Sequence, residues 1–215
     1  MTRATRTVVF VHGLWMTGHE SLFLRRELKK LLDAEVVVFS YRSVVNDVAQ
    51  NALQLCEFLR TLNAERIDLV GHSLGGLVIL RALESFEPSA PGRVVLLGSP
   101  LQGCETARSL SHIPFLKAML GRGIEQEAIK SEAREWTGAR EVGVIAGDLS
   151  MGMGRLVASL TTANDGTVLV SETRMRGTTD HIVLPVSHTG MVFSGVVGQQ
   201  TAEFLRNGRF LHSAS

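Results

Sequence analysis

Short runs of β-branched and other aliphatic residues alternate with amphipathic segments along this chain. The runs are rich in Val, Ile and Leu and lack the polar alternation of a strand with one solvated face. Continuous apolar strands of this kind are typical of a parallel sheet that is covered on both faces. We therefore predict strands at residues 7–12, 35–41, 66–71, 93–98, 141–147 and 181–187.

The segments between these runs carry apolar residues at helical spacing. In residues 19–33 the leucines fall mostly on one face, and residues 46–62 carry a similar stripe. Two further helices are expected, one starting at Leu74 and one over residues 191–206. This alternation predicts an α/β fold with a mostly parallel sheet, right-handed crossovers and helices on both faces. In such sheets the functional site lies at the carboxyl ends of the strands.

No linker, low-complexity block or repeat divides the chain, so we interpret residues 1–215 as a single domain. Two connections are longer than a crossover requires. We interpret residues 101–140 as a helical excursion that forms a possible cap or lid, and residues 147–165 as a second long connection. The alternative is a decorated crossover that packs a small core of its own.

Composition and charge narrow the class of protein. The 22 basic and 21 acidic residues give a formal net charge of +1, so a nucleic-acid partner is not expected. The apolar run at residues 8–11 is too short for a signal peptide, and no run approaches the roughly 18 residues of a membrane span. We therefore expect no integral membrane segment and a cytoplasmic location. The sequence does not indicate an oligomeric state.

Cysteine and histidine spacing points away from metal chemistry. The two cysteines, Cys56 and Cys104, lie far apart and show no disulfide framework or C-x-x-C motif. The seven histidines show no H-E-x-x-H or similar spacing. We therefore expect no metal site.

The corner between the third predicted strand and the following helix reads Gly71-His72-Ser73-Leu74-Gly75, which fits G-x-S-x-G. A tight turn places Ser73 in an uncommon backbone conformation, and glycines on both sides avoid a collision with the neighbouring strand and helix. The hydroxyl of Ser73 then projects from the top of the sheet. The N–H of Leu74 points from the helix start, where positive partial charge stabilises a developing oxyanion. The motif predicts Ser73 as a nucleophile.

A serine hydroxyl needs a general base within hydrogen-bond reach, and the base needs an orienting acid. On this arrangement the acid and then the base follow the serine along the chain. Of the later histidines, His112 precedes any acid loop, His181 begins the last strand and His212 lies in the tail. Only His188 follows the last strand at its carboxyl end and precedes the final helix. We predict His188 as the base, with a helix-capping role as the alternative.

Two aspartates after the fifth predicted strand are candidates for the acid. Asp148 directly follows the strand, and Asp165 lies in the sequence Asn164-Asp165-Gly166. We favour Asp165, because Asn-Asp-Gly forms a tight turn that can present a carboxylate. Asp148 remains the alternative acid.

A second oxyanion donor is expected after the first strand. Gly13 allows the chain to bend, so that the N–H of Leu14 can aim at the same point as that of Leu74. His12 is expected to be structural. Trp15 adjoins this donor and is a candidate substrate contact, with a packing role as the alternative. Apolar residues of the two long connections could line an acyl pocket or form a local core, among them Phe115, Met119 and Met153.

Five segments carry a recognisable combination of motifs. They are VVFVHGLW (8–15), LVGHSLGG (69–76), LLGSPLQG (96–103), NDGTV (164–168) and LPVSHTGMVFS (184–194). Together they resemble the α/β-hydrolase superfamily, in particular its compact bacterial lipase and esterase group. The resemblance covers residues 6–206, but residues 101–140 have no counterpart in it. It implies a strand order like 2-1-3-4-5-6, without the two leading strands of larger members.

The resemblance also implies an activity. Ser73, His188 and Asp165 would be the nucleophile, base and acid, and the amides of Leu14 and Leu74 the oxyanion donors. No cofactor would be needed. The expected reaction is hydrolysis of a small-molecule or lipid carboxylic ester through an acyl-enzyme. The alternatives are a thioesterase or acyltransferase with the same triad, and an inactive hydrolase scaffold that serves as a binding protein.

Overall fold

A computed structural model of the chain describes residues 5–102, 135–150 and 162–212. The candidate substrate contacts Phe115, Met119 and Met153, and most of the predicted excursion, lie outside the described residues. Within the described part, all strands join one parallel sheet in the order β2-β1-β3-β4-β5-β6, which confirms the predicted order. The strands are β1 (Thr7–Val11), β2 (Glu35–Phe39), β3 (Ile67–His72), β4 (Val94–Leu97), β5 (Val142–Gly147) and β6 (Asp180–Leu184).

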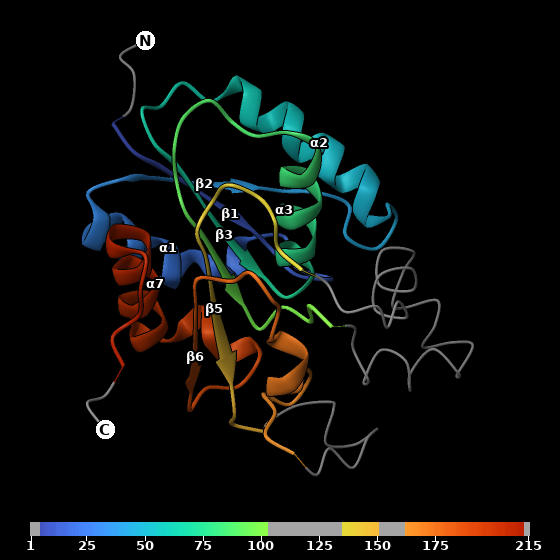
Figure 1. Cartoon of the computed structure of the whole chain (residues 1–215), viewed down its shortest axis with the longest axis vertical. Helices are drawn as coiled ribbons and strands as arrows, with labels where there is room; N and C mark the ends of the chain where they lie inside the picture. The colour runs from blue at the N-terminus through green and yellow to red at the C-terminus, as the bar shows by residue number, and fades with distance from the viewer. Residues whose placement is uncertain (1–4, 103–134, 151–161, 213–215) are drawn as a thin grey trace.

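Helices cover both faces of this sheet (Figure 1). α2 (Val48–Thr61) packs on α3 (Leu74–Ser85) over one face, and α1 (Leu22–Leu32) packs on α7 (Gly195–Asn207) over the other. Short 3-10 turns occur at η1 (His19–Ser21), η2 (Val170–Thr173) and η3 (Thr189–Phe193). The predicted helices are therefore present, with the first beginning three residues later than expected and the last four.

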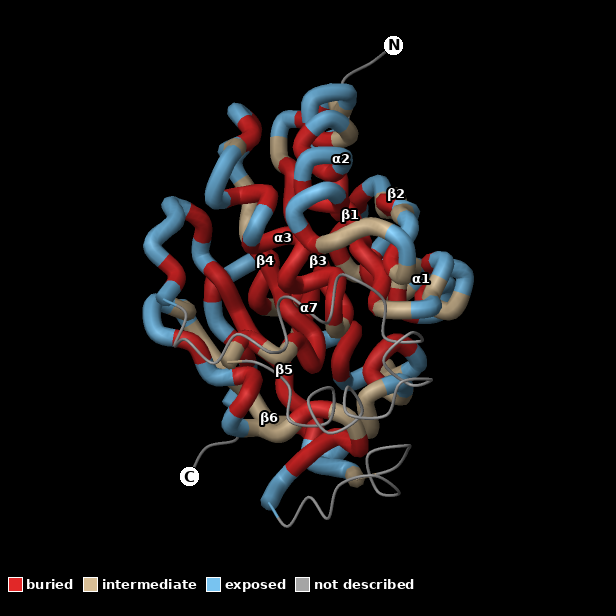
Figure 2. Tube along the Cα trace, turned by 90° about the vertical axis from the view of Figure 1, so that its right-hand side faces the viewer, coloured by how far each residue is buried: buried red, intermediate tan, exposed pale blue. Residues whose placement is uncertain are grey.

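Strand β1 shows why these strands read as unbroken apolar runs. Val9 and Val11 pack into the core beneath α2 and α3, whereas Val8 and Phe10 pack into the core beneath α1 and α7. All four side chains are completely buried. Each burial of this kind is worth about 1.5–3 kcal/mol, so a polar residue at either face would be costly. Figure 2 shows the inner strands β1, β3, β4 and β5 as buried segments between helices whose outer sides are exposed.

A buried carboxylate lies near the amino-terminal end of β3. Asp68 of β3 is fully buried and accepts hydrogen bonds from Nε of Arg6 (2.7 Å) and Nε of Arg66 (3.0 Å). It also accepts from the backbone N–H of Arg93 at 2.7 Å. This charge is therefore paired and hydrogen-bonded, as a buried carboxylate requires. In the described part of the chain, no helix is both long and apolar enough to cross a bilayer.

Candidate active site

The turn between β3 and α3 consists of one residue. β3 ends at His72 and α3 begins at Leu74, so Ser73 alone reverses the chain, with φ 53° and ψ −121°. A positive φ is uncommon for a residue with a Cβ and persists only where the surroundings impose it. The predicted sharp corner is present, and its strained residue is the serine.

The glycines on either side of Ser73 are sterically required. A Cβ on Gly75 would lie 2.2 Å from the carbonyl oxygen of Val11, at the end of β1. A Cβ on Gly71 would lie 2.7 Å from the backbone nitrogen of Gly76, in the first turn of α3. Both distances are far below van der Waals contact, so the strand, the turn and the helix can approach this closely only without side chains there.

An imidazole and a carboxylate meet at the carboxyl ends of the strands, where Ser73 also lies. His188 Nδ1 lies 2.7 Å from Oδ2 of Asp165, and the two side chains are 11% and 1% exposed. The other carboxylate oxygen, Oδ1, accepts hydrogen bonds from the N–H groups of Thr167 (2.9 Å) and Val168 (2.8 Å). The backbone N–H of His188 donates to the carbonyl of Asp165 at 2.8 Å. With Nδ1 directed at the carboxylate, Nε2 is the ring nitrogen left for proton transfer.

Among the described residues, none of the other candidates for acid and base bonds to His188 or Asp165. The side chain of Asp148 is exposed, and its backbone N–H donates to the carbonyl of Leu184 at 3.1 Å. His181 Nε2 lies 2.9 Å from the hydroxyl of Thr173, and His212 pairs with Asp180 at the amino end of β6. His112 is outside the described residues. No group of three or more His, Cys, Asp or Glu able to hold a metal occurs among the residues that are described.

His72 links the serine turn to the loop that carries His188. It is completely buried, and its Nε2–H donates to the backbone carbonyl of His188 at 3.0 Å. The two rings are 4.9 Å apart between centroids. Burial, followed by the neighbouring His188, lowers the pKa of His72 from 6.5 to about 3, so its ring is neutral. Because His72 directly precedes Ser73, this contact brings Ser73 and His188 to the same rim.

Two backbone N–H groups near Ser73, those of Leu74 and Leu14, have no acceptor in the described part of the chain. Leu74 is the first residue of α3, so its N–H has no acceptor within the helix. No described residue accepts a hydrogen bond from the N–H of Leu74 or of Leu14, and none bonds to the hydroxyl of Ser73. The turn after β1 also adjoins the serine, because a Cβ on Gly13 would lie 3.2 Å from Ser73 Cβ.

Contacts that the sequence did not reveal hold the turn after β1. His12 is fully buried, and its Nδ1–H donates to the carbonyl of Gly13 at 2.8 Å. Its Nε2 accepts from the N–H of Tyr41 at 3.3 Å, so both nitrogens are occupied and His12 is structural. Ser43 accepts the N–H of Trp15 at 3.2 Å. Nothing in the local sequence of residues 40–47 signals these contacts, because their partners are 28 and 29 residues away.

Gly98 is a further residue that the sequence did not single out. It has φ 55°, and a Cβ there would lie 3.0 Å from Asp165 Oδ2 and 3.2 Å from His188 Nδ1. The carboxylate and imidazole therefore pack directly on its backbone. The only available signal was the Gly-Ser-Pro sequence that follows β4.

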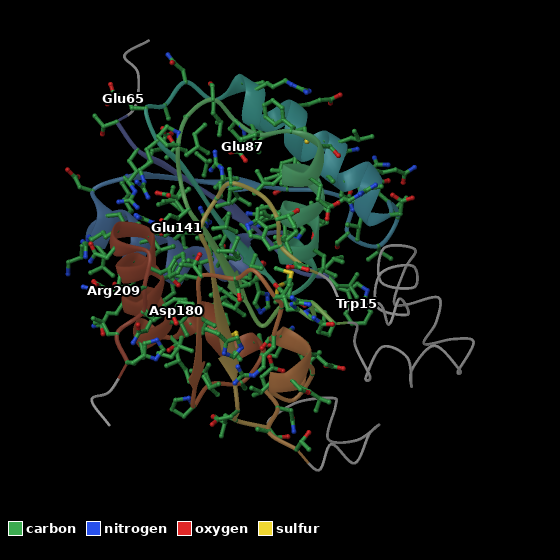
Figure 3. The ribbon with its side chains drawn as sticks, in the orientation of Figure 1. Trp15, Glu65, Glu87, Glu141, Asp180 and Arg209 are labelled. Carbon is green, nitrogen blue, oxygen red and sulfur yellow. The ribbon has the colours of Figure 1, made fainter. Side chains whose placement is uncertain are left out.

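Trp15 follows the carboxyl end of β1, has φ 57° and is 49% exposed. Figure 3 shows it on the opposite side of the molecule from Glu65, which precedes β3. Trp15 therefore lies at the same end of the strands as Ser73 and His188. A large part of its side chain is exposed to solvent.

Comparisons with known proteins agree with this architecture. A model of the alpha/beta hydrolase family matches residues 8–196. The mature lipase BlEst2 of Bacillus licheniformis is similar in structure, with a TM-score of 0.70 and 16% identity over 95% of this chain and 91% of that one. A metagenomic carboxyl esterase matches with a TM-score of 0.63 and 19% identity, over 87% of this chain and 65% of the esterase.

A third similar structure carries another activity in its name. The thioesterase RedJ, from the prodiginine biosynthetic pathway of Streptomyces coelicolor, matches with a TM-score of 0.60 and 13% identity, over 93% of this chain and 84% of that one. Comparison with curated protein sequences finds no significant match. At identities this low, the structural likenesses establish a shared fold and do not by themselves transfer an activity.

Proposed function

The chain belongs to the alpha/beta hydrolase family, and on this premise we propose that it hydrolyses carboxylic esters through an acyl-enzyme. Ser73 is the nucleophile, His188 the general base, and Asp165 the acid that orients the imidazole. The observation that carries the proposal is the 2.7 Å contact between His188 Nδ1 and Asp165 Oδ2, at the rim where Ser73 forms a one-residue turn.

In the first half-reaction Ser73 Oγ attacks the acyl carbonyl, while Nε2 of His188 takes the hydroxyl proton. The C–O bond to the alcohol then breaks, and the alcohol leaves with that proton. In the second half-reaction water attacks the acyl-enzyme, His188 takes a proton from the water, and Ser73 is restored as the acid product leaves. The carboxylate of Asp165 stabilises the imidazolium that forms in both halves.

The amides of Leu14 and Leu74 are the proposed donors to the oxyanion. Two observations support this assignment. No described residue accepts a hydrogen bond from either N–H, and Leu74 is the first residue of a helix whose amino end carries positive partial charge. In other enzymes, removal of one such donor costs about 10²–10³ in kcat.

The proposed substrates are small-molecule or lipid esters, and the resemblance to a lipase and a carboxyl esterase supports this class. A thioesterase is the second candidate, because the same triad attacks thioesters and RedJ shares the fold. Trp15 is a proposed substrate contact, because its exposed ring lies beside the proposed oxyanion donor Leu14.

A paired rate measurement tests the proposal. Purified protein is assayed with p-nitrophenyl esters of increasing acyl length and with the matching acyl thioesters, alongside Ser73→Ala. We expect ester turnover that is lost in Ser73→Ala, and covalent labelling of Ser73 by a fluorophosphonate probe. Turnover of thioesters alone would favour the second candidate. A folded protein with neither turnover nor labelling would instead be an inactive hydrolase scaffold.

A further inference from the structure

The connection after β2 holds the turn after β1 at three points. The hydroxyl of Tyr41 donates to the carbonyl of His12 at 2.7 Å, and the N–H of Tyr41 donates to His12 Nε2 at 3.3 Å. The hydroxyl of Ser43 accepts the N–H of Trp15 at 3.2 Å. β2 is an edge strand that bears no residue of the proposed triad. Its carboxyl-terminal connection nevertheless contacts both ends of the segment from His12 to Trp15.

Ser43 forms a hydrogen bond with one of two adjacent backbone amides and not with the other. Leu14 and Trp15 are consecutive, so their N–H groups are adjacent donors in the turn after β1. Ser43 is 5% exposed, and its hydroxyl engages the N–H of Trp15. No described residue accepts the N–H of Leu14. The contact therefore fixes the peptide between Leu14 and Trp15 and does not engage the N–H of Leu14, the proposed oxyanion donor.

Tyr41 fixes the other side of the same turn. Its ring stacks on His12 with centroids 4.4 Å apart and on Phe39 with centroids 5.8 Å apart, which holds the hydroxyl against the His12 carbonyl. That carbonyl also faces α3, because a Cβ on Gly75 would lie 2.6 Å from it. Burial raises the pKa of Tyr41 well above its ordinary value, so the hydroxyl is protonated at neutral pH and can donate this hydrogen bond.

We infer that Tyr41 and Ser43 are positioning residues for the oxyanion hole. They act through the turn from His12 to Trp15 and fix the direction of the Leu14 N–H, without touching the substrate. The inference rests on the proposed function, because it assigns these two side chains a task in the same acyl transfer. A preorganised donor stabilises only the transition state, so a misaligned one lowers kcat and leaves KM nearly unchanged.

The test uses four variants of the full chain, of which Ser43→Thr is the conservative rescue. Ser43→Ala removes the acceptor for the Trp15 N–H, and Tyr41→Phe removes one oxygen and keeps the stacked ring. Ser40→Ala is the matched control, because Ser40 lies on the same connection and is exposed, and among the described residues its hydroxyl bonds only to the carbonyl of Thr17, at 3.1 Å. Each is assayed for kcat, KM and the pH profile of kcat/KM with a p-nitrophenyl ester, and for its melting temperature.

We expect kcat to fall by about 10-fold in Ser43→Ala and in Tyr41→Phe, less than the 10²–10³ that follows complete removal of a donor. KM should stay within about two-fold, and the acid limb of the pH profile should not move, because the His188–Asp165 pair is untouched. Ser40→Ala should match the wild type. Ser43→Thr keeps the oxygen and should restore kcat.

A purely structural role would lower the melting temperature and leave kcat of the folded enzyme unchanged. Wild-type kcat in both folded variants would therefore overturn the inference, as would a rise in KM alone. If Ser43→Ala does not fold, Tyr41→Phe decides the matter by itself. Failure of the proposed function is distinct, because the wild type would then show no ester turnover and no labelling of Ser73.

Discussion

His188 Nδ1 lies 2.7 Å from Asp165 Oδ2, although the two residues are 23 positions apart. The carboxylate does not depend on the histidine for its placement. Its other oxygen accepts two backbone N–H groups from the turn that follows it, Thr167 and Val168. A carboxylate fixed in this way can set both the orientation and the tautomer of an imidazole, which is what a triad acid must do.

Replacing Asp165 should therefore be far more damaging than replacing Asp148. Asp165→Asn keeps the shape but removes the charge, so we expect kcat/KM for an ester to fall by roughly 10⁴-fold, the scale known for triad acids. Asp148→Asn changes an exposed side chain after β5 and should leave kcat/KM within about three-fold of the wild type. Steady-state kinetics of the two variants provide the comparison. Equal losses of kcat/KM would show that Asp165 is not the triad acid.

Gly75 should tolerate no side chain. Gly75→Ala places a methyl group 2.2 Å from the carbonyl oxygen of Val11, so β1 and α3 must separate, at a cost of about 3 kcal/mol or more. The control is Gly198→Ala in the interior of α7, where the nearest contact is an ordinary 3.4 Å. That change should add about 0.5–1 kcal/mol of stability. Urea unfolding measures both, and a stable Gly75→Ala enzyme with full activity would contradict the steric account.

His72 should make the protein less stable in acid. Its pKa is about 3 in the folded protein and 6.5 when unfolded, so between these values the unfolded chain binds more protons. The free energy of unfolding therefore falls as the pH falls from 6.5, by up to about 1.4 kcal/mol per pH unit from this residue.

The variant His72→Gln removes this titration and keeps an N–H donor near the carbonyl of His188. Urea unfolding at a series of pH values between about 4 and 6 should then show a shallower dependence of stability on pH than in the wild type. Equal slopes in the two proteins would mean that His72 does not carry the effect.

The buried carboxylate of Asp68 should matter for stability and little for chemistry. Asp68→Asn removes the partner of Arg6 and Arg66, and loss of one member of a buried ion pair costs about 3–5 kcal/mol. Glu84→Gln breaks an exposed pair with Arg81, whose side chain is 51% exposed, and should cost at most about 1 kcal/mol. The midpoints of urea unfolding compare the two, and similar midpoints would contradict this ranking.

The inner strands could be predicted because they bury both faces, which makes β1 an unbroken run from Val8 to Val11. The turn at Ser73 could be predicted because a strand, a helix and two glycines leave room for one residue. Chain order then limited the bases to His188, since it alone among the later histidines follows the last strand at its carboxyl end. The order of the strands in the sheet came from the resemblance to a known family, because periodicity does not determine which strands are neighbours.

The contacts that position the proposed site could not be predicted. The imidazole of His72 bonds to a backbone carbonyl of His188, and a backbone partner leaves no trace in the sequence. Tyr41 and Ser43 contact a turn on the neighbouring strand, so their roles depend on tertiary packing. Gly98 is needed because two side chains from distant segments pack on its backbone, which no local pattern records.

The most direct test of the account is to trap the acyl-enzyme. Wild-type protein is quenched in acid during turnover of a p-nitrophenyl ester and digested, and the peptides are analysed by mass spectrometry. We predict one acyl group on the peptide that contains Ser73 in the wild type, and none in Ser73→Ala. Ester turnover with no adduct on Ser73, or an adduct that persists on another residue in Ser73→Ala, would contradict the central claim.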